Sequence, residues 1–292
     1  MWRTLADMRL LCCVGLNACA QALTMMPGVA DPWCKILVLW PETSGLRYHA
    51  RSVTHTDHDM IEASPVESPE AFPAERSEFL LRGPVGVLEC AVDVPEPAKQ
   101  RPITIVICHP HPQHGGTMHN KVVTIMERAM RELGLRTVRF NSRGVGASEG
   151  TFDDGYGETD DLFAVVEWVR RTRPDDQLWL GGFSFGAYVS LRAAANLSLG
   201  QLISIAPPVD RYDFSNLPRP ECPWLVVQGD EDDVVSADAV QSWVERTEPP
   251  PDLIIMQRAG HFFHRRLMDL RGLLKNGVRN QLHRGIQGSS IK

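Results

Sequence analysis

One short stretch limits what this chain can fold into more than any other. Residues 178–180 (LWL) are typical of a buried strand, and they lead into a Gly182-x-Ser184-x-Gly186 turn, after which a helix-compatible pattern begins. A side chain at position 182 or 186 would collide across such a turn, and the serine between them needs backbone angles that crowded neighbours forbid. This layout is typical of a nucleophile elbow, which presents a serine hydroxyl at the carboxyl end of a strand.

Strand and helix patterns alternate on both sides of this turn. Two short strands flanking Gly83 and Pro84 open the regular region at Ser77. The later strands are expected over residues 103–108, 136–141, 202–205, 224–228 and 253–256, and the helices over 120–133, 159–172, 185–197, from about 237, and over 267–282. We therefore expect an α/β fold with a mostly parallel, doubly wound sheet of about eight strands flanked by helices.

Two polar loops follow later strands of this pattern. The acidic run 230–233 (DEDD) comes after the strand over 224–228, and His261 comes after the strand over 253–256. A serine hydroxyl is a poor nucleophile at neutral pH, so it needs a histidine base, and an acid must orient that base. The order serine, aspartate, histidine, each just past a separate strand, is the order seen in α/β-hydrolases.

Several motifs make the resemblance specific. Residues 109–123 read HPHPQHGGTMHNKVV, residues 143–148 read RGVGAS and residues 260–264 read GHFFH. From about 77 to 282 the chain resembles the bacterial serine α/β-hydrolases, and it is most similar to their small, lidless members. The resemblance implies an α/β-hydrolase fold without a large cap domain and a triad of Ser184, Asp232 and His261, with Asp232 as the second aspartate of a Gly-Asp-x-Asp run.

Two backbone N–H groups are expected to bind the oxyanion. Phe185 opens the helix after the serine, and its N–H faces the site. Pro110 and Pro112 have no N–H, so His111 is the donor between them on the loop that supplies the second group. The histidines at 109, 111 and 114 also have a short spacing that zinc sites use, but no carboxylate or thiolate is patterned with them, so we expect no metal.

The acid and the base each have alternatives. Asp230 or Asp233 could replace Asp232, and one of them is expected to cap the turn or the following helix. Asp210 and Asp213, after the preceding strand, are a second location for the acid. His264 lies one helical turn beyond His261 and is expected to face solvent or to pack.

The segment 206–223 is too short for a helical cap, so an open site is expected. Aromatic side chains near it could form apolar walls, namely Tyr188, Tyr212, Phe214, Phe262 and Phe263.

The composition fits a single large enzyme domain. A net charge of −6 without a basic run argues against nucleic acid as a partner, and no apolar stretch is long enough to span a membrane. The seven cysteines form no disulfide framework, so reduced and mostly buried thiols are expected.

We therefore expect a carboxylesterase-like serine hydrolase that acts on a small-molecule acyl substrate and needs no cofactor. Thioesterase, peptidase and acyltransferase activities share this apparatus, and the sequence does not give the oligomeric state. The alternative function is that of a catalytically idle α/β-hydrolase scaffold that acts as a binding module.

The N-terminal part differs from the rest. We expect little regular structure over residues 1–76, a hydrolase domain over 77–284 and a disordered tail over 285–292. Residues 1–20 have the outline of a short export signal, but Met60 is followed by a Pro- and Glu-rich leader and then the patterned domain. This favours a cytoplasmic product that starts at Met60 over an exported one.

A chain that begins at Met60 should therefore fold and keep a thermal midpoint within a few degrees of the full-length chain, because residues 1–59 bury little apolar surface. Intact-mass measurement on protein from its own cells checks the start. A mass that begins at Cys19 or Gln21 would instead support the export signal.

Overall fold

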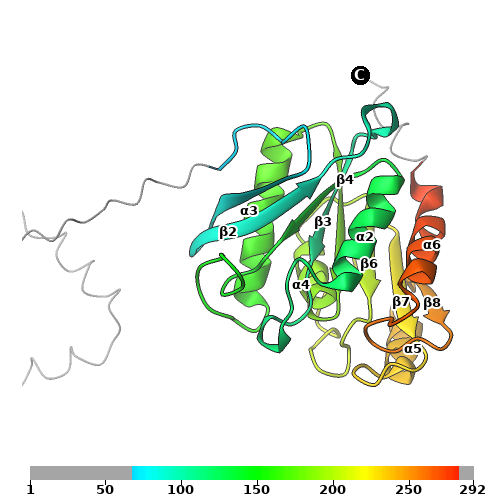
Figure 1. Ribbon diagram of the computed structural model, residues 1–292. Coiled ribbons are helices and arrows are strands. Elements are labelled where there is room, and N and C mark those ends of the chain that lie inside the picture. Colours follow the sequence, from blue (N-terminus) through cyan, green and yellow to red (C-terminus); the bar gives the residue numbers. More distant parts are fainter. Residues whose placement is uncertain (1–67, 283–292) are drawn as a thin grey trace, which may run out of the picture. The chain divides into compact units, whose positions relative to one another are not determined.

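The computed structural model describes residues 68–282 (Figure 1). The expected N-terminal extension up to residue 67 and the expected tail over 285–292 lie outside the described residues. Eight strands form one sheet, in the order β1-β2-β4-β3-β5-β6-β7-β8. Their bounds are β1 Ser77–Gly83, β2 Gly86–Asp93, β3 Ile103–Cys108, β4 Arg136–Phe140, β5 Gln177–Phe183, β6 Gln201–Ile205, β7 Trp224–Gly229 and β8 Asp252–Met256.

The sheet is mostly parallel, as the sequence predicts. Strand β2 runs antiparallel to both of its neighbours, β1 and β4, and every other neighbouring pair is parallel. The carboxyl ends of β3 to β8 therefore share one edge of the sheet. Because the loops that leave those ends carry the candidate residues, the topology alone brings them to one edge.

Five α-helices cover the two faces of the sheet. Their bounds are α2 Lys121–Glu132, α3 Tyr156–Thr172, α4 Phe185–Ala194, α5 Ala237–Arg246 and α6 Leu267–Gly277. Helices α2 and α6 pack on one face, and α3, α4 and α5 pack on the other (Figure 1). The two resulting layers of apolar side chains enclose the sheet and account for its continuous apolar strands.

Three helix ends differ from the sequence predictions. Helix α3 begins at Tyr156 rather than at 159, because the Glu158 carboxylate accepts hydrogen bonds from the N–H groups of Asp153 and Gly155 and caps the first turn. Helix α4 ends at Ala194 rather than at 197. Helix α6 stops at Gly277, a poor helix former, and a short 3₁₀ turn, Arg279–Gln281, follows it.

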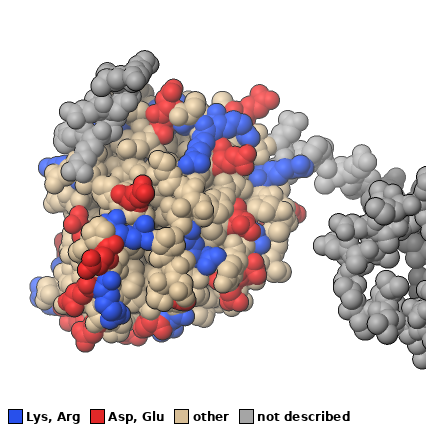
Figure 2. Space-filling view, turned by 180° about the vertical axis from the view of Figure 1, so that it is seen from behind, with Lys and Arg blue, Asp and Glu red and all other residues tan. Residues whose placement is uncertain are grey.

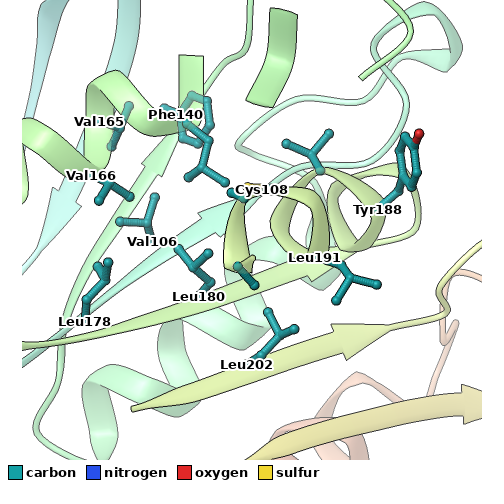
Figure 3. Close-up of a cluster of buried hydrophobic side chains, with 14 of the residues drawn as sticks. Val106, Cys108, Phe140, Val165, Val166, Leu178, Leu180, Tyr188, Leu191 and Leu202 are labelled. Atoms are coloured by element: carbon teal, nitrogen blue, oxygen red, sulfur yellow. The ribbon is translucent and has the colours of Figure 1, made fainter. Parts of the chain in front are cut away.

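The core beside α3 and α4 shows how the helices are held. Val106, Leu180 and Leu202 lie on three neighbouring strands and are fully buried (Figure 3). They pack in one cluster with Val165 of α3 and Leu191 of α4. All six residues of β3 are buried, so this strand is covered on both faces of the sheet.

Part of the segment before β1 joins this core. The Phe72 ring stacks on the Trp168 ring of α3 with centroids 5.3 Å apart. The indole N–H of Trp168 donates a 2.8 Å hydrogen bond to the carbonyl oxygen of Pro69. Part of the segment for which the sequence predicts little regular structure therefore packs against α3.

The charges are mixed on the face seen in Figure 2, and the described thiols are buried. On the face seen in Figure 2, Lys and Arg side chains are interspersed with Asp and Glu side chains, so this face offers no broad basic surface to a nucleic-acid backbone. Cys90, Cys108 and Cys222 are free and buried. Within residues 68–282, no helix is both long and apolar enough to cross a membrane.

The loop after β4 is tied to α3 by a buried ion pair. Both the Nε and Nη2 atoms of Arg143 donate to the Asp161 carboxylate, at 3.0 and 2.8 Å, and the backbone N–H of Arg143 donates to it at 2.9 Å. Asp161 is fully buried, and Arg143 is 7% exposed. The pair fixes the start of a loop that reaches the carboxyl edge of the sheet.

Replacing Asp161 by Ala should lower the free energy of unfolding by about 3–5 kcal/mol, because it leaves the Arg143 guanidinium buried without its counter-charge. Urea unfolding measures the change. The matched control is Asp160→Ala, on the exposed side of the same helix, with an expected change of about 0.5 kcal/mol or less. Equal losses in the two variants would show that the ion pair does not hold the loop.

Candidate active site

The turn between β5 and α4 holds Ser184 in a strained conformation. Its φ is +52° and its ψ is −120°, a region that non-glycine residues rarely occupy. The Ser184 N–H donates to the Ile205 carbonyl oxygen at 2.8 Å, which ties the turn to the end of β6. A Cβ added at Gly182 would lie 2.1 Å from the Gly186 carbonyl oxygen, so the predicted steric need for glycine is confirmed.

Three side chains from separate loops form a hydrogen-bonded chain. The Ser184 Oγ lies 3.2 Å from His261 Nε2, and His261 Nδ1 lies 2.9 Å from Asp232 Oδ2. Because a carboxylate only accepts hydrogen bonds, His261 carries its proton on Nδ1 and accepts from the serine hydroxyl at Nε2. The His261 side chain is 3% exposed and that of Asp232 is fully buried, so bulk water does not compete for these contacts.

The Asp232 carboxylate is held from several sides. Its Oδ1 accepts the N–H groups of Val234 at 2.9 Å and Val235 at 2.7 Å, and its Oδ2 also accepts from Gln228 Nε2 at 3.0 Å. Burial alone raises the pKa of Asp232, but the hydrogen bonds from His261, Val235 and Val234 outweigh it and hold the pKa below its ordinary value. The group is therefore ionised and oriented at neutral pH.

The alternative acids and base lie elsewhere. Asp230 is exposed and accepts the Ala259 N–H at 3.3 Å, which fits the capping role expected for it or for Asp233. Asp213 binds Ser215 and Asn216 within its own turn. The remaining candidates, Asp210, Asp233 and His264, are exposed. Among the described carboxylates, only Asp232 is hydrogen-bonded to His261.

The two expected oxyanion donors come from neighbouring segments. A Cβ at Gly186 would lie 2.3 Å from the Cys108 carbonyl oxygen, so the first turn of α4 packs directly on the end of β3. The rings of His111 and Phe185 lie 5.1 Å apart. Within residues 68–282, neither the His111 N–H nor the Phe185 N–H donates a hydrogen bond, which leaves both available to a ligand.

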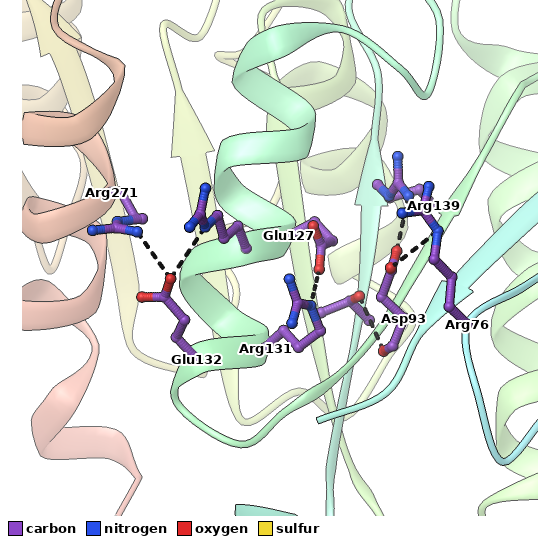
Figure 4. Close-up of polar contacts among 9 residues, drawn as sticks. Arg76, Asp93, Glu127, Arg131, Glu132, Arg139 and Arg271 are labelled. Carbon is purple, nitrogen blue, oxygen red and sulfur yellow. Dashed lines mark hydrogen bonds and ion pairs between the residues drawn. The ribbon is translucent and has the colours of Figure 1, made fainter. Parts of the chain in front are cut away.

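Sequence reasoning missed the polar side chains that anchor the loop after β3. The Met118 N–H donates to Asn141 Oδ1 at 2.8 Å, and Arg139 Nη1 donates to the Met118 carbonyl oxygen at 3.0 Å. Arg139 is itself paired with Asp93 at 2.8 Å, and Figure 4 shows this pair beneath α2. The sequence contains an indication of these roles: Arg139 and Gln228 are polar residues in strands that are buried along their whole length, so each needs a buried hydrogen-bond partner.

Four of the five predicted wall residues have aromatic contacts with Phe185, His261 or Tyr188. The Tyr188 ring stacks on the Tyr212 ring at 4.6 Å and contacts the Phe214 ring at 5.5 Å. Phe262 is 43% exposed and lies edge-on to His261, with centroids 5.0 Å apart. Phe263 is different: it has a φ of +51° and is fully buried in the core formed with α2 and α6, so it is not available as a wall.

The histidine cluster of the sequence has a structural explanation. The rings of His111 and His114 stack at 4.4 Å, whereas His109 is buried and hydrogen-bonded to Pro110 and Ser142. In the described part of the chain, no group of three or more His, Cys, Asp or Glu side chains is arranged to hold a metal ion.

Comparison with known proteins gives consistent matches. The family model described as X-Pro dipeptidyl-peptidase (S15 family) matches residues 86–217, a range that ends before Asp232 and His261. The chain is 38% identical over 172 residues to an uncharacterized protein of Rickettsia prowazekii. The aligned region covers 56% of this chain and 72% of that protein.

Two proteins of known structure have a higher sequence identity to this chain. A serine α/β-hydrolase without a lid from Xanthomonas campestris is 57% identical, with a TM-score of 0.71 over 73% of this chain and 97% of that one. An α/β serine hydrolase homologue from Coxiella burnetii is 48% identical, with a TM-score of 0.69 over 71% of this chain and all of that one.

The lowered pKa of Asp232 predicts an acid-sensitive contribution to stability. Since the folded-state pKa lies below the unfolded value, ionised Asp232 stabilises the fold above that unfolded value, and the contribution is lost as the pH falls through the folded-state pKa. The free energy of unfolding should therefore fall less between about pH 5 and about pH 3 in Asp232→Asn than in the wild type.

Urea unfolding at both pH values measures this difference. Asp230→Asn is the matched control and should lose as much stability as the wild type. The same pH dependence in Asp232→Asn and the wild type would mean that the carboxylate is not stabilised in its ionised form.

Proposed function

Because this chain belongs to the α/β serine hydrolases without a lid, we propose that it cleaves carboxylic esters or related acyl compounds through an acyl-enzyme. The observation that carries the proposal is the unbroken hydrogen-bonded chain from Ser184 Oγ through His261 to Asp232, with the serine on a strained turn. These hydrogen bonds also argue against the alternative of an idle scaffold, because a scaffold does not need three buried polar side chains aligned in this way.

Acylation follows from this arrangement. Ser184 Oγ attacks the carbonyl carbon of the substrate while His261 Nε2 accepts the hydroxyl proton. The resulting imidazolium is stabilised by Asp232, to which its Nδ1–H already donates. His261 then gives the proton to the leaving alcohol as the tetrahedral intermediate collapses to the acyl-enzyme. Water, activated by His261 in the same way, attacks the acyl carbon and releases the acid and Ser184.

The negative charge of each tetrahedral intermediate needs donors that are already in position. We assign this role to the N–H groups of Phe185 and His111, which have no other hydrogen-bond acceptor in the described structure. Phe185 is also the first residue of α4, so the positive end of the helix dipole adds to the stabilisation.

The walls of the site favour an apolar acyl or alcohol group. Tyr188, Tyr212 and Phe214 form adjoining rings beside Phe185, and Phe262 covers one side of His261. Burial raises the pKa of Tyr212 to about 12, and the nearby Asp154 carboxylate adds to the shift, so this wall is uncharged at neutral pH. We therefore propose ester substrates with a small apolar or aromatic group.

Ser184→Ala and His261→Ala should each lower kcat on a p-nitrophenyl ester by several orders of magnitude, because each removes one member of a set that acts as a unit. For the same reason the double variant should be hardly slower than either single one. Steady-state kinetics across a series of acyl-chain lengths measures kcat and KM.

Matched controls come from the same loops. His264→Ala, whose side chain is exposed, and Asp230→Asn should keep wild-type turnover, whereas Asp232→Asn should lose several powers of ten in kcat by favouring the wrong histidine tautomer. Near-native turnover in Ser184→Ala would refute the proposed mechanism.

A further inference from the structure

One buried histidine beside the site has no part in the proposed triad. His109 follows the last residue of β3, is 3% exposed and contacts the end of the neighbouring strand β4. Its Nε2 lies 3.1 Å from the backbone nitrogen of Ser142 and 2.9 Å from the Ser142 Oγ. Its Nδ1 lies 2.6 Å from the carbonyl oxygen of Pro110, the next residue.

These partners determine where the proton of His109 lies. A backbone N–H can only donate, so Nε2 must accept from Ser142. A carbonyl oxygen can only accept, so Nδ1 must carry the proton and donate it to Pro110. Burial lowers the pKa of His109 to about 4, so the imidazole is neutral at physiological pH and keeps this tautomer.

The bond to Pro110 also fixes a neighbouring donor. The Pro110 carbonyl and the His111 N–H belong to one planar peptide group and, because that bond is trans, they point in opposite directions. By holding the Pro110 carbonyl on the buried side, His109 turns the His111 N–H away from the core. Gly116 lies close against this peptide group, because a Cβ at that position would lie only 2.0 Å from the Pro110 oxygen.

The far side of His111 is held as well. Its carbonyl oxygen accepts the N–H groups of Gly116 at 3.0 Å and His114 at 3.1 Å. The loop therefore fixes two successive carbonyls and leaves the N–H between them without a protein acceptor among the described residues. Such preorganisation is what an oxyanion donor needs, because a donor that must reorient during the reaction stabilises the transition state less.

We propose that His109 is a positioning residue for the oxyanion hole, which acts by locking the peptide between Pro110 and His111 through its Nδ1–H. This proposal rests on the proposed function, because it assigns a role in the same acyl-transfer reaction. The hydrogen-bond partners of the His109 ring are Pro110 and Ser142, not Ser184, so we expect His109 to act on the rate through His111.

Two substitutions test the two ring nitrogens of His109 separately. His109→Asn places an amide N–H near the position of Nδ1, so it keeps the bond to Pro110 and loses the acceptor for Ser142. His109→Gln places an amide oxygen near the position of Nε2, so it keeps the acceptor and loses the bond to Pro110. His119→Gln, at an exposed histidine of the same loop, is the matched control.

The kinetic expectation is asymmetric. His109→Gln should lower kcat on a p-nitrophenyl ester on the order of a hundredfold with little change in KM, approaching the 10²–10³-fold loss that follows removal of one oxyanion donor. His109→Asn should retain most of kcat, and His119→Gln should match the wild type. Rates are normalised to active sites titrated with a fluorophosphonate, so that a smaller folded fraction is not read as a slower enzyme.

A transition-state analogue provides a second readout. Ser184 Oγ adds to the carbonyl carbon of a trifluoromethyl ketone, its proton passes to His261, and the ketone oxygen becomes an oxyanion. The inhibition constant should rise in His109→Gln by the same factor by which kcat/KM falls. A structural role confined to folding would lower the thermal midpoint without this proportional change.

The wild-type protein gives a third readout that needs no functional variant. The ¹⁵N NMR signals of the His109 ring, assigned by their absence in His109→Asn, should show the proton on Nδ1 at pH 7. A proton on Nε2, or equal rate losses in His109→Asn and His109→Gln, would overturn the role of His109 and leave the triad intact. A wild type without Ser184-dependent turnover would overturn the proposed function and this proposal together.

Discussion

At the turn between β5 and α4, backbone from three segments meets with no side chain in between. Gly182 lies against the Gly186 carbonyl, and Gly186 lies against the carbonyls of Cys108 and His109 at the end of β3. This contact forces Ser184 to a φ of +52° and places the start of α4 next to the loop that carries His111. The nucleophile and both oxyanion donors therefore depend on one close packing of backbone, which explains why two glycines are required there.

Most buried polar atoms around this turn have a hydrogen-bond partner, although Gln228 Oε1 and Arg139 Nε have none among the described residues. Asp232 accepts from two backbone N–H groups, from Gln228 and from His261, and the loop after β3 is anchored through Asn141 and Arg139. The hydrogen bonds that are formed hold the Asp232 carboxylate and the loop after β3 in one arrangement. The side chains of His261 and Asp232, which orient the reacting groups, are buried.

The fold and the three proposed catalytic side chains could be predicted from the sequence for a physical reason. Strands buried on both faces read as continuous apolar runs, and a parallel sheet gathers the loops that follow its strands at one edge. The predicted strand pattern therefore places Ser184 and His261 at the same edge of the sheet.

The remainder depends on tertiary contacts that local pattern does not encode. Phe263 and Phe262 are adjacent and identical in type, yet Phe263 is fully buried and Phe262 is 43% exposed, and of the two only Phe263 has a positive φ. The supporting roles of His109, Gln228 and Arg139 arise from partners far away in the sequence. Likewise, Phe72 stacks on Trp168 although its surroundings in the sequence suggest a solvated leader.

The most direct test of the account is to identify the residue that a fluorophosphonate probe modifies. The probe transfers its phosphonyl group to an activated serine with loss of fluoride, and peptide mass spectrometry locates the adduct. The account predicts a single adduct on Ser184, formed rapidly in the wild type and slowed by several powers of ten in His261→Ala. An unlabelled protein, or an adduct on another residue, would contradict the assignment of Ser184 as the nucleophile.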